Sequence, residues 1–390
     1  MVLEMRRIGK RAVVVPWENG EEASVVEGID VIAVKTLREA VEYLNGETEI
    51  EPVRSDLGAM VAKACDEEDD FADVKGQEAV KKALEIAVAG GHNVLMIGSP
   101  GSGKTMLARR LTSILPPLTV EEALEVSRIH SVASSKNCGN FVVRRPFRAP
   151  HHTVSSIGLL GGGHQALPGE VSLAHRGGLF LDEFAEFPRH ALEVLRQPLE
   201  DAHVCISRAM AAHDFPSKFM LVAAMNPCPC GYYNSPDKAC RCSHSAVMKY
   251  QSRISGPLID RIDIQVEVSG VDTKALALMG RGESSAEIRE RVMAARAIQS
   301  ERYRSLKGVM TNADVKSRDL ERFCCLTSAM KSELVRMIER LRLSARSYDK
   351  VLRVARTIAD LSMSEAVRFE DLAGAVALRR LDDESNSFWV

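Results

Sequence analysis

The alternation of apolar and polar positions divides the chain into three regions. Between residues 71 and about 268, short runs of consecutive apolar residues alternate with segments that have the helical period. Apolar runs of this length between helices are typical of a parallel sheet that is buried on both faces. The expected elements of this region are helices at 77–89, 104–114 and 189–199 and strands at 93–97, 178–181, 219–224 and 262–268.

The other two regions have different patterns. Residues 1–53 predict strands at 12–15 and 28–34 and a helix at 37–44, which together are too short for a complete domain. After residue 272 no strand pattern recurs, and the period predicts helices at 284–307, 319–325, 331–341, 346–361 and 369–380. The predicted domains are an α/β piece at 1–55, an acidic linker at 56–71, an α/β core at 72–270 and a helical domain at 271–390.

Composition narrows the class of protein only slightly. The 390 residues carry a formal charge of −2, so any contact with nucleic acid must come from a local cluster of Lys and Arg. The chain does not open with the apolar stretch of a signal peptide, and no apolar run approaches the roughly 18 residues that span a bilayer. We expect a cytoplasmic protein without membrane contact, whose nine cysteines are thiols or metal ligands.

Residues 98–105 form a phosphate-binding motif. They follow an expected strand, read Gly-Ser-Pro-Gly-Ser-Gly-Lys-Thr and open an expected helix, as the GxxxxGK[ST] motif requires. Glycines let backbone N–H groups face the phosphates, and the helix N-terminus adds partial positive charge. We expect Lys104 to contact the β and γ phosphates of ATP and Thr105 to bind Mg²⁺; the alternative is a glycine-rich turn without a ligand. The residues expected around the nucleotide are Gly98, Ser99, Pro100, Gly101, Ser102, Gly103, Lys104, Thr105 and Met106.

Polar residues follow two further expected strands. Asp182 and Glu183 come directly after the strand at 178–181, where open α/β sheets bind their ligands. Asp182 is expected to hold Mg²⁺ and Glu183 to polarise the attacking water, because phosphoryl transfer needs a positioned nucleophile and neutralised charge. Asn226 follows the strand at 219–224 and could orient the water or sense the γ-phosphate. The alternatives are a helix N-cap for the acids and an Asn-Pro turn for Asn226.

Two pairs of cysteines flank a turn-rich loop. Cys228-Pro-Cys230 and Cys240-Arg-Cys242 can close on one ion, and four thiolates in a tetrahedron suit zinc. The CxC spacing is tighter than the usual CxxC, and the alternative is four unpaired thiols. The other cysteines are scattered and are expected to be buried small residues; they are Cys65, Cys138, Cys205, Cys324 and Cys325.

Together with the segments between them, these motifs resemble a known family: the magnesium-chelatase-like AAA+ ATPases, and within them the ComM/YifB group. The resemblance is dense from Asp73 to Leu361. The segments that carry it are Phe-Arg-Ala-Pro-His-His-Thr at 147–153, Gly-Gly-Gly at 161–163, Pro-Gly-Glu at 168–170, Leu-Arg-Gln-Pro-Leu-Glu at 195–200, Ile-Ser-Arg at 206–208, Asn-Pro-Cys-Pro-Cys-Gly at 226–231, Ser-Gly-Pro-Leu-Ile-Asp-Arg-Ile-Asp at 255–263, Ser-Ala-Arg at 344–346 and Ala-Arg-Thr-Ile-Ala-Asp at 355–360.

The resemblance implies an architecture and a function. It implies an AAA+ α/β core followed by a helical lid, in a ring ATPase of the helicase type whose relatives are linked to DNA branch migration during natural transformation. The family normally opens with a longer domain similar to the C-terminal fold of Lon protease, of which residues 1–53 look like the last segment.

The resemblance also assigns arginines. It implies that Arg261 is the arginine finger, reaching the γ-phosphate of ATP in a neighbouring subunit, with Arg253 as the second candidate. A structural ion pair of Arg261 with Asp260 or Asp263 is the alternative. Arg346 is the best match to the second sensor, which contacts nucleotide in its own subunit, and Arg353 is the other candidate.

Two insertions carry basic residues. The segment at 141–163 contains Arg144, Arg145, Arg148, His151 and His152 before its glycines, and an expected hairpin at 204–215 contains Arg208 and His213. In relatives, insertions at these places project toward the ring pore, and basic, glycine-rich loops there suit a nucleic-acid backbone. The alternatives are solvated loops or a subunit interface. Adjacent histidines point in different directions, so we do not predict a metal site there.

These observations leave three hypotheses. We expect a motor, assembled as a hexameric ring, that couples ATP hydrolysis to DNA remodelling. The first alternative is a protein-remodelling or chelatase-like ATPase, and the second is a nucleotide-gated scaffold that hydrolyses slowly. Lys104, Asp182, Glu183 and Arg261 favour a motor over a scaffold, whereas DNA is favoured over protein mainly by the resemblance.

Overall fold

The computed structural model describes residues 2–54, 69–133, 141–207, 212–235, 238–270, 280–341 and 343–379. Contacts divide the chain into two compact units. One contains residues 1–67 and 117–145, and the other contains residues 68–116 and 146–390. The domain boundaries expected from the sequence stay a prediction, and most of the expected linker lies outside the described residues.

The larger unit is built on a parallel sheet of five strands in the order β11-β3-β10-β7-β4. The strands are β3 (Val94–Gly98), β4 (Phe147–Arg148), β7 (Gly178–Leu181), β10 (Met220–Met225) and β11 (Ile264–Val268). In the register, Ile97 of β3 lies beside Met225 of β10, and Ala223 of β10 lies beside Leu181 of β7. The residues that follow these three strands are therefore neighbours at one edge of the sheet.

Alternate residues of the central strands face two separate layers of the core. Leu95 and Leu221 belong to one hydrophobic cluster, whereas Val94, Met96 and Val222 belong to the other. Every residue of β3, β7 and β10 is buried, as the continuous apolar runs predict. The α/β class expected from the sequence is confirmed.

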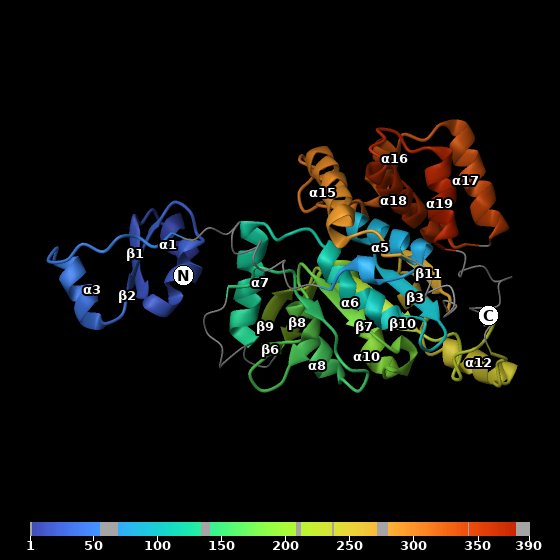
Figure 1. Cartoon of the computed structure of the whole chain (residues 1–390), viewed down its shortest axis with the longest axis horizontal. Coiled ribbons are helices and arrows are strands. Elements are labelled where there is room, and N and C mark those ends of the chain that lie inside the picture. Colours follow the sequence, from blue (N-terminus) through green and yellow to red (C-terminus); the bar gives the residue numbers. More distant parts are fainter. Residues whose placement is uncertain are drawn as a thin grey trace. The chain divides into compact units, whose positions relative to one another are not determined.

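Helices cover the sheet and continue into a helical C-terminal region (Figure 1). The hydrophobic cluster that contains Val94, Met96 and Val222 also contains residues of α5, α6 and the C-terminal helices. The α/β core and the helical region therefore share buried contacts. The helices near the sheet are α5 (Glu78–Gly90), α6 (Lys104–Ile114), α8 (Ser156–Leu160), α9 (Glu170–Leu173), α10 (Arg189–Glu193), α11 (Arg196–Asp201), α12 (His244–Gln251) and α13 (Gly256–Ile259). The C-terminal helices are α15 (Ser285–Arg302), α16 (Ser317–Cys324), α17 (Ser328–Arg340), α18 (Ala345–Leu361) and α19 (Phe369–Ala377).

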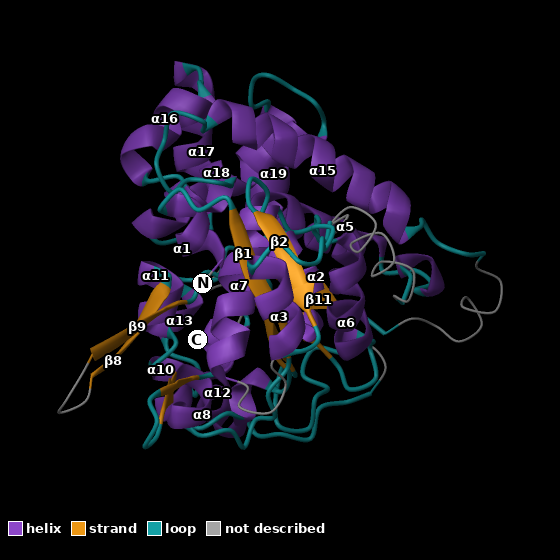
Figure 2. Cartoon of the chain, turned by 90° about the vertical axis from the view of Figure 1, so that its left-hand side faces the viewer, coloured by secondary structure: helices purple, strands orange, loops and turns teal. Residues whose placement is uncertain are grey.

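Two antiparallel pairs complete the larger unit. Strands β5 (Gly161–Gly162) and β6 (Leu167–Pro168) pair near α8. Strands β8 (His203–Ser207) and β9 (Ala212–Pro216) form the hairpin that the sequence predicts. Figure 2 shows this hairpin extending outward beyond α10, α11 and α13.

The smaller unit contains a two-stranded parallel sheet of β1 (Ala12–Pro16) and β2 (Asp30–Val34). Its helices are α1 (Val2–Arg7), α2 (Gly20–Ser24), α3 (Leu37–Leu44) and α7 (Val120–Ala133). Val25 shares a small buried cluster with Leu118, Ala123 and Phe141, so residues from the middle of the chain complete the core of this unit.

One expected helix needs correction, and several of the observed helices were not expected from the sequence. The helix expected at 189–199 is two helices, α10 and α11, because Pro198 has no N–H to donate to the carbonyl of Val194 and its ring crowds that carbonyl. Helix α7 was not expected, although its start carries a readable signal. Thr119 and Glu122 each accept a hydrogen bond from the other's backbone N–H, which is the reciprocal capping arrangement.

None of the helices within the described part of the chain is long and apolar enough to cross a lipid bilayer.

Candidate active site

The phosphate-binding loop connects β3 to α6 and starts where β3 lies close to β11. It starts at Gly98, the last residue of β3, and leads into α6 at Lys104. A Cβ atom on Gly98 would lie 2.2 Å from the carbonyl oxygen of Val268 in the adjacent β11. Only glycine allows the backbone of the loop to come so close to β11.

The amino group of Lys104 lies under the loop. Its Nζ donates hydrogen bonds to the carbonyl oxygens of Gly98 (2.7 Å) and Ser99 (2.9 Å) and lies 3.3 Å from Oδ1 of Asn226. Burial lowers the pKa of Lys104 to about 8, although the charge of Asp182 acts in the opposite direction. Because the Lys104 amino group is poorly solvated and bonded to neutral carbonyl oxygens, negatively charged phosphate oxygens can replace those carbonyls as its hydrogen-bond acceptors.

Thr105 and Asp182 meet across the site. The Thr105 hydroxyl donates a 2.6 Å hydrogen bond to Oδ2 of Asp182, and the other carboxylate oxygen accepts from the backbone N–H of Glu183 at 2.9 Å. A hydroxyl and a carboxylate at this separation are oxygen ligands of the kind that Mg²⁺ takes together with water and phosphates. The donor set therefore fits the magnesium ion expected from the sequence.

Glu183 has an unexpected partner. Its backbone is left-handed, with φ of 52°, and its Oε2 lies 2.8 Å from Nδ1 of His152. The His152 ring also packs edge-on against Phe187. His152 belongs to the insertion at 141–163, so this insertion contacts the expected water-activating carboxylate directly.

Asn226 connects the loop to the cysteine-bearing segment. It follows β10 and is half-buried beside Lys104. Five residues later, Gly231 has φ of +83°, and a Cβ atom on it would lie 2.4 Å from Cδ of Pro100. The turn after β10 therefore packs directly on the phosphate-binding loop.

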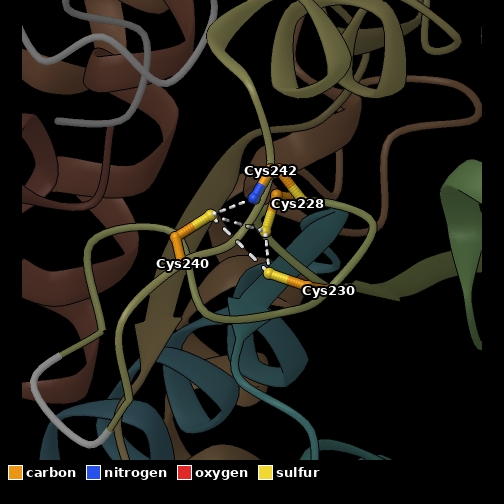
Figure 3. A group of neighbouring side chains, drawn as sticks. All are labelled: Cys228, Cys230, Cys240 and Cys242. Carbon is orange, nitrogen blue, oxygen red and sulfur yellow. Dashed lines mark hydrogen bonds between the residues drawn. The ribbon is translucent and has the colours of Figure 1, made fainter.

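The four cysteines expected to bind zinc are close together (Figure 3). The sulfur of Cys228 lies 3.4 Å from that of Cys230 and 3.7 Å from that of Cys240, and the sulfurs of Cys230 and Cys240 are 3.6 Å apart. All four sulfurs, including that of Cys242, lie within 4.8 Å of one another. Hydrogen bonding from the backbone N–H of Arg241 lowers the pKa of Cys230 to about 6.

The remaining cysteines are only partly as expected. Cys324 is buried, but Cys205 and Cys325 are exposed, so the expectation of buried residues is wrong for these two. Cys205 lies in a hairpin strand with one open face, and Cys325 ends α16 in a left-handed conformation. Cys65 and Cys138 lie outside the described residues.

The finger candidates are held by their own chain. Arg261 donates to the carbonyl oxygens of Pro257 (2.7 Å) and Arg196 (3.2 Å) and forms an ion pair with Glu200. The carboxylate partner of Arg261 is therefore Glu200 and not the Asp260 or Asp263 considered from sequence. Arg253 pairs with Glu186 at 2.6 Å.

The sensor candidates lie at the start of α18 and about two turns further on. Arg346 forms a 3.3 Å ion pair with Asp260, the residue before Arg261. Arg353 donates to the carbonyl oxygen of Val315 at 2.8 Å. Neither hydrogen bond involves the phosphate-binding loop, and the sensor role of both arginines stays a prediction.

Two of the arginines in the first insertion are bound to carboxylates. Arg145 pairs with Glu122 at 2.7 Å, and Arg148 donates two hydrogen bonds to the carboxylate of Glu170, at 2.6 and 2.9 Å. In the second insertion, His213 is exposed on β9, whereas Arg208 lies outside the described residues.

The fold and the site define a class of protein: an α/β core of the AAA+ type with a helical C-terminal region. The features that define it are the strand order, the loop between β3 and α6, and the acids that follow β7. Comparison with known proteins identifies the family. Residues 70–276 match the family described as "Magnesium chelatase, subunit ChlI", and residues 282–379 match its C-terminal family.

Individual relatives agree with this match. The chain is 41% identical over 375 residues to "Competence protein ComM" of Haemophilus influenzae, covering 95% of this chain and 72% of the relative. It is 40% identical over 377 residues to "Uncharacterized protein YifB" of Escherichia coli, with the same coverage. It is 26% identical over 178 residues to the "Magnesium-chelatase 38 kDa subunit" of Rhodobacter capsulatus, covering 40% of this chain and 50% of that protein. The chain belongs to the magnesium-chelatase-like AAA+ family, in its ComM/YifB group.

Proposed function

We propose that this chain hydrolyses ATP and uses the energy as a ring-shaped motor that remodels DNA. The observation that carries the proposal is the convergence of five residues at the edge of the sheet. Lys104 lies beside Asn226, and Thr105 is hydrogen-bonded to Asp182, which is followed by Glu183. Lys104 and Thr105 open α6, which follows β3, while the acids follow β7 and Asn226 follows β10; these three strands are adjacent in the sheet.

Each of these groups has a role in phosphoryl transfer. Lys104 would neutralise the β and γ phosphates, and Thr105 and Asp182 would hold Mg²⁺, which neutralises the charge that develops on the phosphates. Glu183 would orient and polarise the attacking water, with Asn226 as sensor of the γ-phosphate. Because Glu183 is bound to His152, hydrolysis requires that this contact opens.

The ring follows from the proposed finger. The hydrogen bonds of Arg261 are with Arg196, Pro257 and Glu200, which are not residues of the phosphate-binding loop. We propose that Arg261 acts on the nucleotide of a neighbouring subunit in a hexamer. The Arg261 side chain is only 18% exposed, but its partner Glu200 is 66% exposed, so the Glu200 carboxylate can turn into solvent. The triphosphate of a neighbour can therefore compete with it for the guanidinium.

DNA as the polymer is supported by the relatives and by the hairpin. A relative that is 41% identical is named a competence protein, and the β8–β9 hairpin extends outward beyond α10, α11 and α13 (Figure 2). We propose that this hairpin, together with Arg208, which lies between its two strands in the sequence, contacts the phosphate backbone.

A second candidate is the remodelling of a protein substrate. The observation that favours it is the neutralisation of Arg145 by Glu122 and of Arg148 by Glu170, which leaves the first insertion with less positive charge than its sequence suggests.

The deciding experiment compares ATP turnover with single-stranded DNA, with forked DNA, with an unfolded polypeptide and with no polymer. A DNA motor should be stimulated by DNA, and its DNA affinity should fall as salt rises because phosphate contacts release counterions. Arg208→Ala should weaken DNA binding and leave the basal ATPase unchanged. Stimulation by polypeptide alone, with DNA affinity independent of salt, would support the second candidate.

A further inference from the structure

We propose that Cys228, Cys230, Cys240 and Cys242 hold a structural zinc ion that braces the phosphate-binding loop. Zinc binds thiolate at about 2.3 Å, so the edges of a regular tetrahedron of sulfurs are about 3.8 Å long. The sulfurs of Cys228, Cys230 and Cys240 lie 3.4, 3.7 and 3.6 Å from one another. Three of the thiols are thus at nearly the spacing of a filled site, and the sulfur of Cys242 lies within 4.8 Å of them (Figure 3).

The chemistry of the donors selects the ion. Four soft thiolates in a tetrahedron are typical of zinc or iron, and sulfur-only sites exclude magnesium and calcium. Four protein ligands leave no position for water, so the site is structural and not catalytic. Binding of Zn²⁺ releases to solvent the proton of each thiol that becomes a thiolate ligand, up to four in all, with no change of oxidation state.

The surrounding contacts fix the site at the exit of a central strand. The first pair of cysteines follows β10 and the second directly precedes α12, whose N-cap is Ser243. The side chain of Gln251, at the end of α12, donates a 3.1 Å hydrogen bond to the carbonyl oxygen of Pro227 in a buried position. One ion would therefore fasten the strand exit to the helix start across the loop between the cysteine pairs.

The consequence for the nucleotide site comes through Gly231. This residue lies next to Cys230 and packs on Pro100 of the phosphate-binding loop, and Asn226 lies beside Lys104. Without the ion, the turn that carries Gly231 would lose the cross-link that presses it against Pro100. This part of the inference rests on the proposed ATP site, whereas the metal site itself does not.

Metal analysis tests the site on the full chain purified without added zinc. We expect about one zinc per chain, retained in Cys325→Ser and lost in the double variant Cys230→Ser/Cys240→Ser. Cys325 is an exposed thiol outside the cluster, which makes it the matched control. Cobalt added to the metal-free wild-type chain should give the visible spectrum of tetrahedral thiolate ligation, so the test does not depend on folding of the double variant.

Several results would overturn the inference. They are a metal-free chain with four alkylatable thiols and no cobalt spectrum, iron in place of zinc, and disulfides among these cysteines in freshly purified protein. A chelator that removes the zinc should weaken binding of a fluorescent ATP analogue at least about tenfold, and added zinc should restore it. If the zinc is present but its removal leaves nucleotide affinity unchanged, the bracing role is wrong. If the zinc is present but no nucleotide binds at all, the proposed ATP site fails and the metal site stands.

Discussion

Substitution of Gly231 by alanine tests the contact between the cysteine-bearing turn and the phosphate-binding loop. Gly231 has φ of +83°, and the added Cβ would lie 2.4 Å from Cδ of Pro100. Carbon atoms in favourable contact are about 3.5–4.0 Å apart, so the turn and the loop must separate by about 1 Å or more. Gly308 provides a matched control because its φ is +82° and a Cβ there meets nothing within 4 Å.

The two variants separate backbone strain from displacement of the loop. Alanine in the left-handed region costs about 1–2 kcal/mol, and this cost should lower the stability of both variants by similar amounts. Displacement of a binding group by about 1 Å can reduce enzymatic rate by about 100-fold. Because the turn shares the movement with the loop, we expect Gly231→Ala to lower kcat/KM for ATP at least about tenfold and Gly308→Ala to leave it within about twofold.

Steady-state ATPase assays over a range of ATP concentrations, with thermal unfolding of each variant, measure both effects. The reasoning is refuted if Gly231→Ala and Gly308→Ala are equally stable and hydrolyse ATP with the same kcat/KM. A loss of activity in both variants would instead show that backbone strain, and not the contact with Pro100, is the cause.

Three further predictions follow from the same site. Lys104→Ala should abolish binding of a fluorescent ATP analogue, and the affinity of the wild-type chain for it should fall above about pH 8 as the Lys104 amine loses its proton. Glu183→Gln should bind ATP and barely hydrolyse it. Normal turnover by Glu183→Gln would rule out Glu183 as the residue that activates the water. Arg261→Ala should block hydrolysis and spare binding, and mixing it with Glu183→Gln should restore some turnover, unless mixed rings form and stay inactive. His152→Ala should raise basal ATP turnover by up to about fivefold, because the half-exposed pair of His152 with Glu183 contributes about 0.2–1 kcal/mol. An equal rise in His151→Ala would show that the contact with Glu183 is not responsible.

The parts of the fold and site that could be predicted are those encoded locally. The apolar runs at 93–97 and 178–181 predict β3 and β7 to within a residue, because strands buried on both faces admit no polar position. The acids and the asparagine lie at the ends of such runs, and in a parallel sheet the carboxyl ends share an edge. Their proximity follows from the pattern alone once the sheet is inferred.

The parts that could not be predicted depend on partners far apart in the sequence. His152 lies 31 positions before Glu183, and Glu200 lies 61 positions before Arg261; each pair forms only when folding brings separate segments of the chain together. A charged side chain in the sequence does not show which opposite charge it will meet. For the same reason, Arg145 and Arg148 look like a basic patch in the sequence and are paired with carboxylates in the structure.

The segment that carries the finger is attached to the helical region by buried contacts. Lys350 of α18 donates to the carbonyl oxygen of Ile262 at 2.9 Å, and Arg379 donates to the same oxygen at 2.7 Å. Asp263 is buried against His92 and Lys350; burial alone would raise the pKa of this carboxyl, but these neighbours hold it below its usual range. Charged groups without solvent are costly to separate, so these contacts persist when the exposed ones change.

The ion pair between Arg346 and Asp260 differs from these buried contacts because it is exposed. An exposed pair contributes about 0–1 kcal/mol, which the charge of a bound triphosphate can outweigh. If Arg346 leaves Asp260 for nucleotide, the start of α18 moves while Lys350, one turn further on, stays bound to Ile262. Arg261 lies between these two attachment points in the sequence. Movement of α18 toward nucleotide would therefore act directly on the residue proposed to reach the neighbouring subunit, and would couple the nucleotide sites of the proposed ring.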